Sequence, residues 1–428
     1  MEEKNSEKKE RKMRDSGIPW IGEVPEGWGV NKIKYHLTRN EIKNKPDKQV
    51  LSVYRDYGVI PKDSRDDNHN VTSEDTSKYK YVQKGDLVIN KMKAWQGSLG
   101  VSKYEGIVSP AYYIYKFHDD SFDGKFFHYL IRGCYKDEFR RISGGIREGQ
   151  WDLSAEKFEN TMIIIPPIPE QHRIADFLDS KCSEIDNLIE NLRARVESAK
   201  EYKKAVITEA VTKGLDKDAK MKDSGVEWIG EIPDGWKIVQ FKHIASIKSN
   251  LVQPDKYMKY PQIAPDNIEK DTGRLLSHQT VEESGIISGN HLFYRGQILY
   301  SKIRPNLNKL TVAPFDGLCS ADMYPIESKL PTPFMVYSML STYFVSQVSL
   351  IIQDRVKMPK INQEELGEIK VVVPSQQEML TIADYLDSKC SEIDALLQNY
   401  EDQITTLEEY KKSLIYEYVT GKKEVPAT

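Results

Sequence analysis

Basic, amide and aromatic side chains gather in two short segments of the chain. Residues 90–97 contain two lysines, a tryptophan and a glutamine, and they follow an apolar run that is typical of a β-strand. Residues 301–309 contain two lysines, an arginine and two asparagines. Lysine and arginine bind phosphates and guanine edges, while asparagine and glutamine can form two hydrogen bonds with adenine. Both segments are therefore predicted to be DNA-contacting loops, and for any single residue a solvated polar loop remains the alternative interpretation.

Further basic side chains follow each segment later in the sequence, around residues 140–151 and 355–360. We include most of them in the predicted DNA-binding set because a positive charge is what a phosphate backbone attracts. In the first half of the chain the predicted DNA-binding residues are Lys91, Lys93, Trp95, Gln96, Arg140, Arg141 and Arg147. In the second half they are Lys302, Arg304, Asn306, Asn308, Arg355 and Lys357.

Motifs for catalysis are absent from the sequence. It contains no GxxxxGK[ST] phosphate loop, no HExxH, no paired CxxC and no GxSxG elbow. The eight histidines show no metal-ligand spacing, and His172 is expected to be a surface or capping residue. Asp152 with Glu156 could suggest a nuclease carboxylate cluster, but acidic residues are too common here to support one. We predict a binding protein without a catalytic residue, a metal or a cofactor of its own.

The elements that position these segments occur twice, because the chain is an internal duplication. Residues 15–28 read DSGIPWIGEVPEGW and residues 223–236 read DSGVEWIGEIPDGW, with ten of fourteen positions identical. Residues 174–186 and 382–394 match at twelve of thirteen positions, again 208 residues apart. The sequence between these boxes has diverged strongly, which suits a protein that reads two different targets with one geometry.

The aromatic boxes and the cysteines have structural explanations. Trp20, Trp28, Trp228 and Trp236 lie in apolar, turn-rich boxes and are expected to pack the start of each repeat against its scaffold. Cys182 and Cys390 are expected to be buried small hydrophobic residues, because four cysteines without a CxxC pair indicate neither a disulfide framework nor a zinc site.

Long helices are predicted near the middle and the end of the chain. Between Pro169 and Gly214 the sequence has no glycine or proline, and apolar or small residues recur at alternating spacings of three and four. Ser375 and Glu378 form a capping-box pattern at the start of the second helix. The predicted seam contains Ile185, Ile189, Leu192 and Val196 in the first helix and Ile393, Leu397, Ile404 and Leu407 in the second.

Each predicted helix of some 44 residues would be roughly 65 Å long. The two seams match slot for slot, with Lys203 and Lys411 in equivalent positions, so each helix is the best partner for the other. Two amphipathic helices that pack only on their own domains are the alternative. The rest of each repeat alternates short apolar runs with turn residues, which indicates mixed α/β or β-rich domains with a few helices.

Composition bounds the class of protein. A length of 428 residues with 39% hydrophobic residues suggests two to four domains. No stretch approaches the roughly 18 apolar residues needed to cross a bilayer, so a cytoplasmic protein that binds no membrane is expected. The formal net charge is −4, but the two long helices carry −8 and the remainder +4. Any DNA contact must therefore come from local patches.

The duplicated boxes, the KGDLVINKMKAWQGSLG segment, the PPIPEQ helix start at residues 166–171 and the two IAD(F/Y)LDSKCSEID helices resemble the specificity subunit of type I restriction-modification systems (HsdS). The resemblance spans nearly the whole chain. The second repeat departs from the pattern at its helix start, where residues 374–379 read PSQQEM, and it lacks the Trp-Gln pair of the first.

The resemblance implies an α+β fold in which two tandem-repeated α/β target-recognition domains are separated by two long helices that form an antiparallel coiled coil. The implied organisation is a charged tail (residues 1–14), a first recognition domain (15–169), a helix and linker (170–222), a second recognition domain (223–375) and a second helix with a tail (376–428). Each domain would read one half of a bipartite double-stranded DNA site, and the helices would set the gap.

The resemblance also implies partners. These would be two modification subunits, which bind S-adenosylmethionine and methylate adenine, and restriction subunits that use ATP and Mg²⁺ for translocation and cleavage. The chain itself would be the non-catalytic subunit. A coiled-coil scaffold whose diverged segments bind other proteins is the alternative function.

Overall fold

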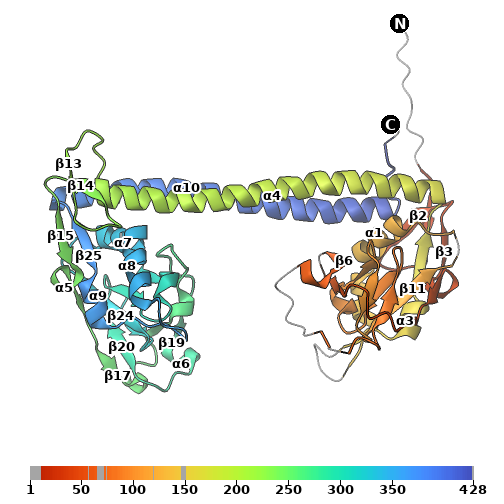
Figure 1. Ribbon diagram of the computed structural model, residues 1–428, viewed down its shortest axis with the longest axis horizontal. Helices are drawn as coiled ribbons and strands as arrows, with labels where there is room; N and C mark the ends of the chain where they lie inside the picture. Colours follow the sequence, from red (N-terminus) through yellow and green to blue (C-terminus); the bar gives the residue numbers. More distant parts are fainter. Residues whose placement is uncertain are drawn as a thin grey trace, which may run out of the picture. The chain divides into compact units, whose positions relative to one another are not determined.

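The computed structural model describes residues 11–55, 57–64, 72–73, 75–118, 120–145 and 151–426 (Figure 1). The chain divides into two units. Unit 1 comprises Met1–Asn191 and Gln403–Thr428, and unit 2 comprises Leu192–Asp402. The division falls inside the two long helices, α4 (Ile168–Lys213) and α10 (Gln376–Val419), because each unit packs part of both helices against its own sheets.

Unit 1 contains twelve strands in its described residues, and they pair only as antiparallel neighbours. Its largest sheet has the order β4-β11-β8-β9. The strands are β1 (Met13–Asp15), β2 (Glu23–Pro25), β3 (Gly29–Lys32), β4 (Leu37–Arg39), β5 (Leu51–Tyr54), β6 (Gly58–Pro61), β7 (Lys80–Val82), β8 (Leu87–Asn90), β9 (Leu99–Val101), β10 (Gly106–Val108), β11 (Tyr112–Phe117) and β12 (Met162–Ile165). The short helices are α1 (Gly124–Cys134), α2 (Lys136–Ile142), α3 (Ala155–Glu159), and the 3₁₀ turns η1 (Ile33–Tyr35), η2 (Lys62–Ser64) and η3 (Ala94–Gln96).

Unit 2 repeats this plan with one enlargement. The sheet β16-β24-β21-β22 corresponds to the largest sheet of unit 1, while a five-stranded sheet β17-β20-β23-β18-β19 includes the parallel pair β18 and β23. The strands are β13 (Met221–Asp223), β14 (Glu231–Pro233), β15 (Lys237–Gln240), β16 (Ala245–Ile247), β17 (Leu251–Val252), β18 (Pro261–Ile263), β19 (Gln279–Thr280), β20 (Asn290–Phe293), β21 (Ile298–Ser301), β22 (Leu310–Val312), β23 (Gly317–Cys319), β24 (Met323–Ser328) and β25 (Lys370–Val373). The short helices are α5 (Phe241–Ile244), α6 (Val281–Ser284), α7 (Thr332–Leu340), α8 (Thr342–Ile352) and α9 (Gln363–Glu368), with the 3₁₀ turns η4 (Pro254–Lys256), η5 (Pro265–Asn267) and η6 (Pro305–Leu307).

The two long helices form as their sequence predicts. Gly214 follows α4 with φ of +78° and donates its backbone N–H to the carbonyl of Ala210, which is the left-handed helix cap that glycine allows. At the start of α10, Ser375 donates its backbone N–H and its hydroxyl to the Glu378 carboxylate. The capping box is therefore confirmed.

The helices pair antiparallel within each unit. In unit 1 the start of α4 meets the end of α10, where the rings of Phe177 and Tyr418 lie 4.5 Å apart. Lys411 bonds both carboxylate oxygens of Asp186 at 2.6 and 2.7 Å. In unit 2 the end of α4 meets the start of α10, and Lys203 bonds both oxygens of Asp394 at the same two distances.

These ion pairs explain the lysines that interrupt the predicted seam. The Lys203 side chain is only 13% exposed, so its stem lies in the seam while its ammonium reaches the opposite helix. Of the seam residues, five are buried (Ile185, Ile189, Leu192, Val196 and Ile393) and three are half-buried (Leu397, Ile404 and Leu407). All eight predicted seam residues are thus buried or half-buried, and those of α4 are the more deeply buried.

A core cluster joins each helix pair to its domain. In unit 1, Leu178 of α4 and Leu414 of α10 belong to the same buried cluster as Phe126 and Phe127 of α1. In unit 2, Leu386 of α10 belongs to the cluster that contains Phe334 and Met335 of α7. The alternative of independent amphipathic helices is excluded for the described residues, because each helix packs against both its domain and the other helix.

The aromatic boxes pack as expected at three of their four tryptophans. Trp28 and Trp236 are buried, and Trp20 is half-buried with its ring edge-on to Tyr135 at 5.8 Å. Trp228 is 43% exposed, and among the described residues no aromatic ring stacks on it. The packing predicted for Trp228 is therefore wrong. The cysteines are buried free thiols, as predicted for Cys182 and Cys390.

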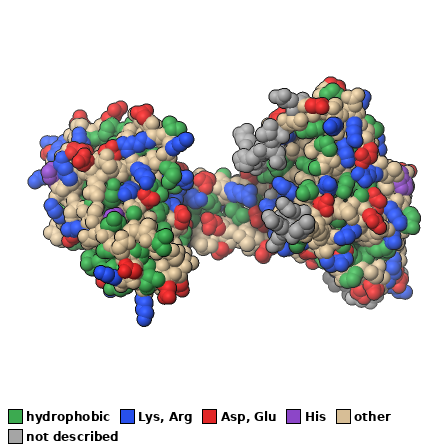
Figure 2. Space-filling view, turned by 90° about the horizontal axis from the view of Figure 1, so that it is seen from below, with side chains coloured by type: hydrophobic (Ala, Val, Ile, Leu, Met, Phe, Trp, Pro, Cys, Tyr) green, Lys and Arg blue, Asp and Glu red, His purple; other side chains and the backbone are tan. Residues whose placement is uncertain are grey.

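Charges are mixed over the surface of both units. Figure 2 shows Lys and Arg side chains interspersed with Asp and Glu on the visible face of each globular part, without a large field of one sign. Among the residues that the structure describes, no single helix is long and apolar enough to span a membrane. Helices α7 and α8 meet that criterion only as a pair bent by 58°.

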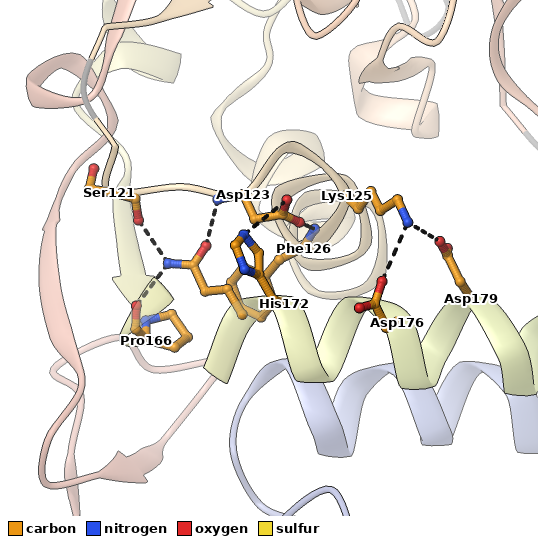
Figure 3. A network of polar contacts seen from close by, with 9 residues as sticks. Ser121, Asp123, Lys125, Phe126, Pro166, His172, Asp176 and Asp179 are labelled. Atoms are coloured by element: carbon orange, nitrogen blue, oxygen red, sulfur yellow. Dashed lines mark hydrogen bonds and ion pairs between the residues drawn. The ribbon is translucent and has the colours of Figure 1, made fainter. Parts of the chain in front are cut away.

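Gln171 ties the start of α4 to its domain through hydrogen bonds to Ser121, Asp123 and Pro166, which Figure 3 labels. Its side chain is fully buried, and its amide nitrogen donates to the carbonyls of Ser121 and Pro166 at 2.7 and 2.8 Å. Its amide oxygen accepts the backbone N–H of Asp123 at 2.9 Å. The equivalent residue in unit 2 is Met379, which is 4% exposed and packs in the apolar core. The departure at residues 374–379 therefore replaces a polar junction with an apolar one.

The paired lysine and aspartate across the helices generate a stability prediction. Asp394→Ala leaves the half-buried Lys203 ammonium without its carboxylate, and the free energy of unfolding should fall by about 1–2 kcal/mol. Adding Lys203→Leu should restore most of that loss, because leucine fills the seam without a buried charge. Thermal denaturation of both single variants and the double variant measures the coupling.

A matched control lies on the same helix. Glu392 pairs with Lys389 at 2.9 Å on the exposed face of α10, so Glu392→Ala should cost at most about 0.5 kcal/mol. Equal losses in the free energy of unfolding for Asp394→Ala and Glu392→Ala would show that the ion pair between Lys203 and Asp394 stabilises the protein no more than a surface ion pair does.

Candidate nucleic-acid interface

The two basic segments follow equivalent strands of the equivalent sheets in the two units. In unit 1 the segment connects β8 to β9, and in unit 2 it connects β21 to β22. Strand β21 is buried along its length, β8 is buried except for the half-buried Asn90 at its end, and the two strands pair with β24 and β11, respectively. A rigid central strand therefore presents each segment, so its position is set by the sheet and its side chains are free to differ.

In unit 1 a second loop joins the first segment. The backbone N–H of Leu153 donates to the carbonyl of Lys91 at 3.0 Å, and Asp152 pairs with Gly144 across the base of the loop. The rings of Trp95 and Trp151 lie 5.7 Å apart. Tertiary structure thus brings together two basic segments that are some fifty residues apart in the chain.

Unit 2 repeats this junction. The backbone N–H of Ile361 donates to the carbonyl of Lys302 at 3.0 Å, which is the equivalent of the contact between Leu153 and Lys91. The N–H of Arg304 donates to the carbonyl of Pro359 at 2.8 Å. We call the two paired segments of each unit its reader loops: residues 91–97 with 140–145 and 151–153 in unit 1, and residues 302–309 with 353–361 in unit 2.

Five of the predicted DNA-binding side chains are exposed and have no described hydrogen-bond or ion-pair partner in the part of the chain that the structure describes. They are Lys93 and Arg140 in unit 1 and Arg304, Asn306 and Lys357 in unit 2. An exposed cation that no protein carboxylate neutralises is available to a phosphate or to a base edge.

Four other predicted cations already have partners. The Arg141 guanidinium forms two bonds with the Glu138 carboxylate, at 2.6 and 2.7 Å. Arg355 bonds both oxygens of Glu365, and its guanidinium holds the pKa of that carboxyl below its usual value. The remaining two are Lys91, 3.7 Å from Asp152, and Lys302, whose ammonium lies 5.2 Å from the centre of the Tyr324 ring. These side chains stabilise the conformation of the loops through contacts within the protein, and they also contribute positive charge.

The predicted DNA-binding residues with amide or aromatic side chains differ in how far they are buried. Trp95 and Gln96 are half-buried in η3, and the Trp95 indole donates to the carbonyl of Met92 at 3.1 Å. Asn308 is 1% exposed, so its amide does not reach the surface in this conformation. We now interpret Asn308 as a loop-shaping residue, because its φ of +43° places it in the left-handed region that asparagine tolerates. Arg147 lies outside the described residues.

Sequence reasoning missed two apolar side chains in the unit 2 reader loops. Val356 is 94% exposed, and Met358 is 53% exposed with φ of +45°. They flank Lys357, so an apolar surface lies beside a free cation. Apolar side chains contact thymine methyl groups or wedge between base steps. Their position next to Arg355 and Lys357 was the available signal, but a search for basic and amide residues passes over it.

The acidic and histidine side chains near these loops lie apart from one another in the described part of the chain. Among the described residues no group of three or more His, Cys, Asp or Glu side chains is placed to hold a metal ion. His172 is exposed, 3.7 Å from the Asp123 carboxylate, which fits the surface position predicted for it. Asp152 and Glu156 are separate too, since Asp152 faces Lys91 and Glu156 lies in the first turn of α3.

The fold and the loops define a duplicated binding protein with two diverged reader surfaces on one frame. The family model described as the type I restriction modification DNA specificity domain matches residues 25–198. The chain is 30% identical over 349 residues to the specificity subunit of the type I restriction enzyme EcoDI of Escherichia coli, an alignment that covers 77% of each chain. The chain therefore belongs to the family of type I restriction enzyme specificity subunits.

Other relatives agree with this assignment. The chain is 24% identical over 432 residues to the putative type I restriction enzyme MjaX specificity subunit of Methanocaldococcus jannaschii, covering 95% of this chain and 96% of that one. A solved structure from work on complex assembly and conformational transition of the type I R-M system has a TM-score of 0.66 and 13% identity, covering 94% of this chain and 99% of that chain. The latter shows a shared fold. Membership of the family also supports the prediction of a non-catalytic subunit.

The backbone of Arg304 generates a prediction about the reader loops of unit 2. Arg304 has φ of +43° and ψ of 52°, a conformation that costs a non-glycine residue about 1 kcal/mol. Arg304→Gly should therefore raise the free energy of unfolding by about 0.5–1 kcal/mol, while Arg304→Ala should leave it nearly unchanged. Chemical denaturation of the two variants checks this. A loss of stability in both would show that the arginine side chain supports the fold.

Proposed function

We propose that each unit reads one half of a bipartite double-stranded DNA site through its reader loops. The observation that carries the proposal is the equivalence of the two loop junctions, Leu153 to Lys91 and Ile361 to Lys302, on equivalent strands of two equivalent sheets. One frame thus carries two unlike sets of exposed side chains. Two unlike sets read two unlike half-sites, so the whole target is asymmetric.

The chemistry of the loops suits DNA more than protein. Free cations attract phosphates and determine register, and Arg304 and Asn306 offer the donors and acceptors that discriminate base edges in the major groove. The relatives are named as specificity subunits, and the matching family model is named for a DNA specificity domain. A coiled-coil adaptor that only binds proteins is not favoured, because the relatives are named as type I restriction enzyme specificity subunits.

In this proposal the partners carry out the catalysis. The family implies assembly with other restriction-modification subunits, and we propose two modification subunits and the restriction subunits. S-adenosylmethionine, ATP and Mg²⁺ then belong to those subunits, and this chain holds no cofactor. The protein would act in the cytoplasm. The recognition domains would be residues 15–169 and 223–375, with the helices as the spacer.

Alanine substitution of the exposed reader-loop side chains tests the assignment of one half-site to each unit. The double variant Lys93→Ala with Arg140→Ala should weaken recognition of one half-site only, and Arg304→Ala with Lys357→Ala should weaken the other. A lost bidentate base contact costs about 1–3 kcal/mol, so discrimination at the affected half-site should fall roughly 10- to 100-fold. Binding of the assembled methyltransferase to duplexes that are altered in either half-site measures it.

Arg141→Gln is the matched control, because Arg141 adjoins Arg140 but is already bonded to Glu138. Its effect should be smaller than that of Arg140→Ala alone. An equal loss at both half-sites from either double variant, with the protein still folded, contradicts the assignment of one half-site to each unit.

The proposed spacer generates a separate prediction. Inserting four residues at matched points of α4 and α10, after Asn191 and after Asp402, lengthens both helices by about 6 Å. The gap between the half-sites should then lengthen while both half-site sequences stay the same, and methylation mapping of a genome reports all three. The same insertion in the linker, between Asp216 and Lys217, should leave the gap unchanged. An unchanged gap with the longer helices would contradict the spacer role.

A further inference from the structure

A tryptophan and a glutamate meet where each long helix begins. In unit 1 the Trp28 indole N–H donates to the Glu170 carboxylate at 2.9 Å, and in unit 2 the Trp236 indole N–H donates to Glu378 at 3.0 Å. Both members of the second pair lie 208 residues after those of the first. The two sites are therefore equivalent positions of the duplication, and a difference between them is informative.

In unit 1 an arginine of the same chain completes this site. The Arg11 guanidinium bonds the Glu170 carboxylate, and its central carbon lies 5.5 Å from the centre of the Trp28 ring. With Arg11 in place the Glu170 side chain is 13% exposed. Glutamate supplies the charge-assisted hydrogen bond and tryptophan the aromatic face, which together suit a planar guanidinium better than an ammonium.

In unit 2 the equivalent of Arg11 is Ala219, and a cleft of about 650 Å³ is present there. Its lining includes Ala219, Trp236 and Glu378, with Lys220 and Lys237 beside them. Glu378 is exposed, and among the described residues it has no ion-pair partner. The hydroxyl of Ser375, which bonds Glu378 at 2.6 Å, holds the pKa of that carboxyl below its usual value. Glu378 is therefore an ionised carboxylate without a paired cation in the described part of the chain, in a cleft that Asp234, Lys220 and Lys237 also line.

The capacity of Glu378 for hydrogen bonds is not used up. A carboxylate offers about four acceptor positions. The Trp236 indole occupies one, and the Ser375 hydroxyl and backbone N–H occupy two more. Ser375 corresponds to Pro167 of unit 1, which has neither donor. Ser375 therefore replaces part of what Arg11 supplies in unit 1, the hydrogen bonds, but it brings no positive charge.

We propose that this cleft of unit 2 binds an arginine side chain of a partner protein, in the position that Arg11 takes in unit 1. A nucleic acid does not fit, because the Glu378 carboxylate repels phosphate. The lysines at 220 and 237 disfavour a bare cation and favour an arginine with an acidic neighbour, which a protein segment can supply. Residues 1–10 contain no arginine, and the two arginines of the charged tail are already bound in unit 1, Arg11 to Glu170 and Arg14 to the carbonyl of Trp28, so the tail does not provide the ligand. The inference does not depend on how the reader loops recognise DNA.

The test uses the full-length protein labelled with ¹⁵N at its six tryptophans, and the peptide N-acetyl-Arg-Glu-amide as the probe. The indole N–H resonances of Trp28 and Trp236 are assigned with Trp→Phe variants. The peptide should shift the Trp236 resonance in a saturable way and leave Trp28 unchanged. The citrulline analogue, which has the same shape without the charge, should bind roughly tenfold more weakly or worse.

Two variants add the arginine to the unit 2 site and remove it from the unit 1 site. Ala219→Arg should fill the cleft from within the chain, abolish the response of Trp236 and raise the melting temperature. Arg11→Ala should open the equivalent site in unit 1 and create a response at Trp28. Because the two variants change different units, a folding defect in one leaves the other as a valid test, and the remaining indole resonances report whether each protein is folded.

Three outcomes would overturn the proposal. The first is a folded protein in which Trp236 does not respond to the peptide. The second is equal binding of the citrulline analogue, which would show an uncharged amide site. The third is a response to guanidinium chloride or to a short DNA duplex that equals the response to the peptide, since the cleft would then be a simple cation site or part of the DNA surface. Unlike the alanine substitutions in the reader loops, these measurements do not depend on sequence-specific recognition of a half-site, so the two proposals can fail independently.

Discussion

The antiparallel pairing of α4 with α10 is the interaction on which both units depend. Each unit consists of its own sheets, one end of α4 and one end of α10, so neither helix alone completes a core. The ion pairs between Lys411 and Asp186 and between Lys203 and Asp394 have the same geometry in both units. Charged groups that satisfy each other across a seam penalise any shifted register, in which they would be buried without a partner. The pairing therefore determines how the chain is arranged as well as how stable it is.

The duplication keeps the buried frame and lets the surface diverge. The sheet orders β4-β11-β8-β9 and β16-β24-β21-β22 are equivalent. The backbone hydrogen bond that joins the reader loops is 3.0 Å long in both units. Backbone hydrogen bonds do not depend on side-chain identity, so the frame tolerates a Trp-Gln pair in one unit and an arginine with two asparagines in the other. A protein built in this way can change one half of its specificity by changing two loops.

The two helix starts show how one position can be satisfied by different chemistry. Gln171 accepts and donates hydrogen bonds in unit 1 where Met379 packs in an apolar core in unit 2. Arg11 neutralises Glu170, while Glu378 has Ser375 donors and an open cleft. The resulting asymmetry between the units lies in the side chains, since the hydrogen bond between tryptophan and glutamate is present in both.

The sequence alone determined the features that repeat or are periodic. Nearly identical boxes 208 residues apart revealed the duplication, and the spacing of three and four residues predicted both long helices. Ser375 and Glu378 predicted the cap of the second helix, and the seam residues were found buried or half-buried. These features depend on interactions between near neighbours in the chain, or on identity between distant segments, and both can be read in one dimension. The same motifs supported the resemblance to the family to which the chain belongs.

Only the tertiary structure decided which side chains are free. It brought residues 140–145 and 151–153 beside residues 91–97 through contacts between distant segments, removed Asn308 from the surface, paired Arg141 and Arg355 with carboxylates, and exposed Val356 and Trp228. Charge and residue type cannot foretell this, because whether an arginine binds its own carboxylate or a ligand depends on what the fold places within about 3 Å of it.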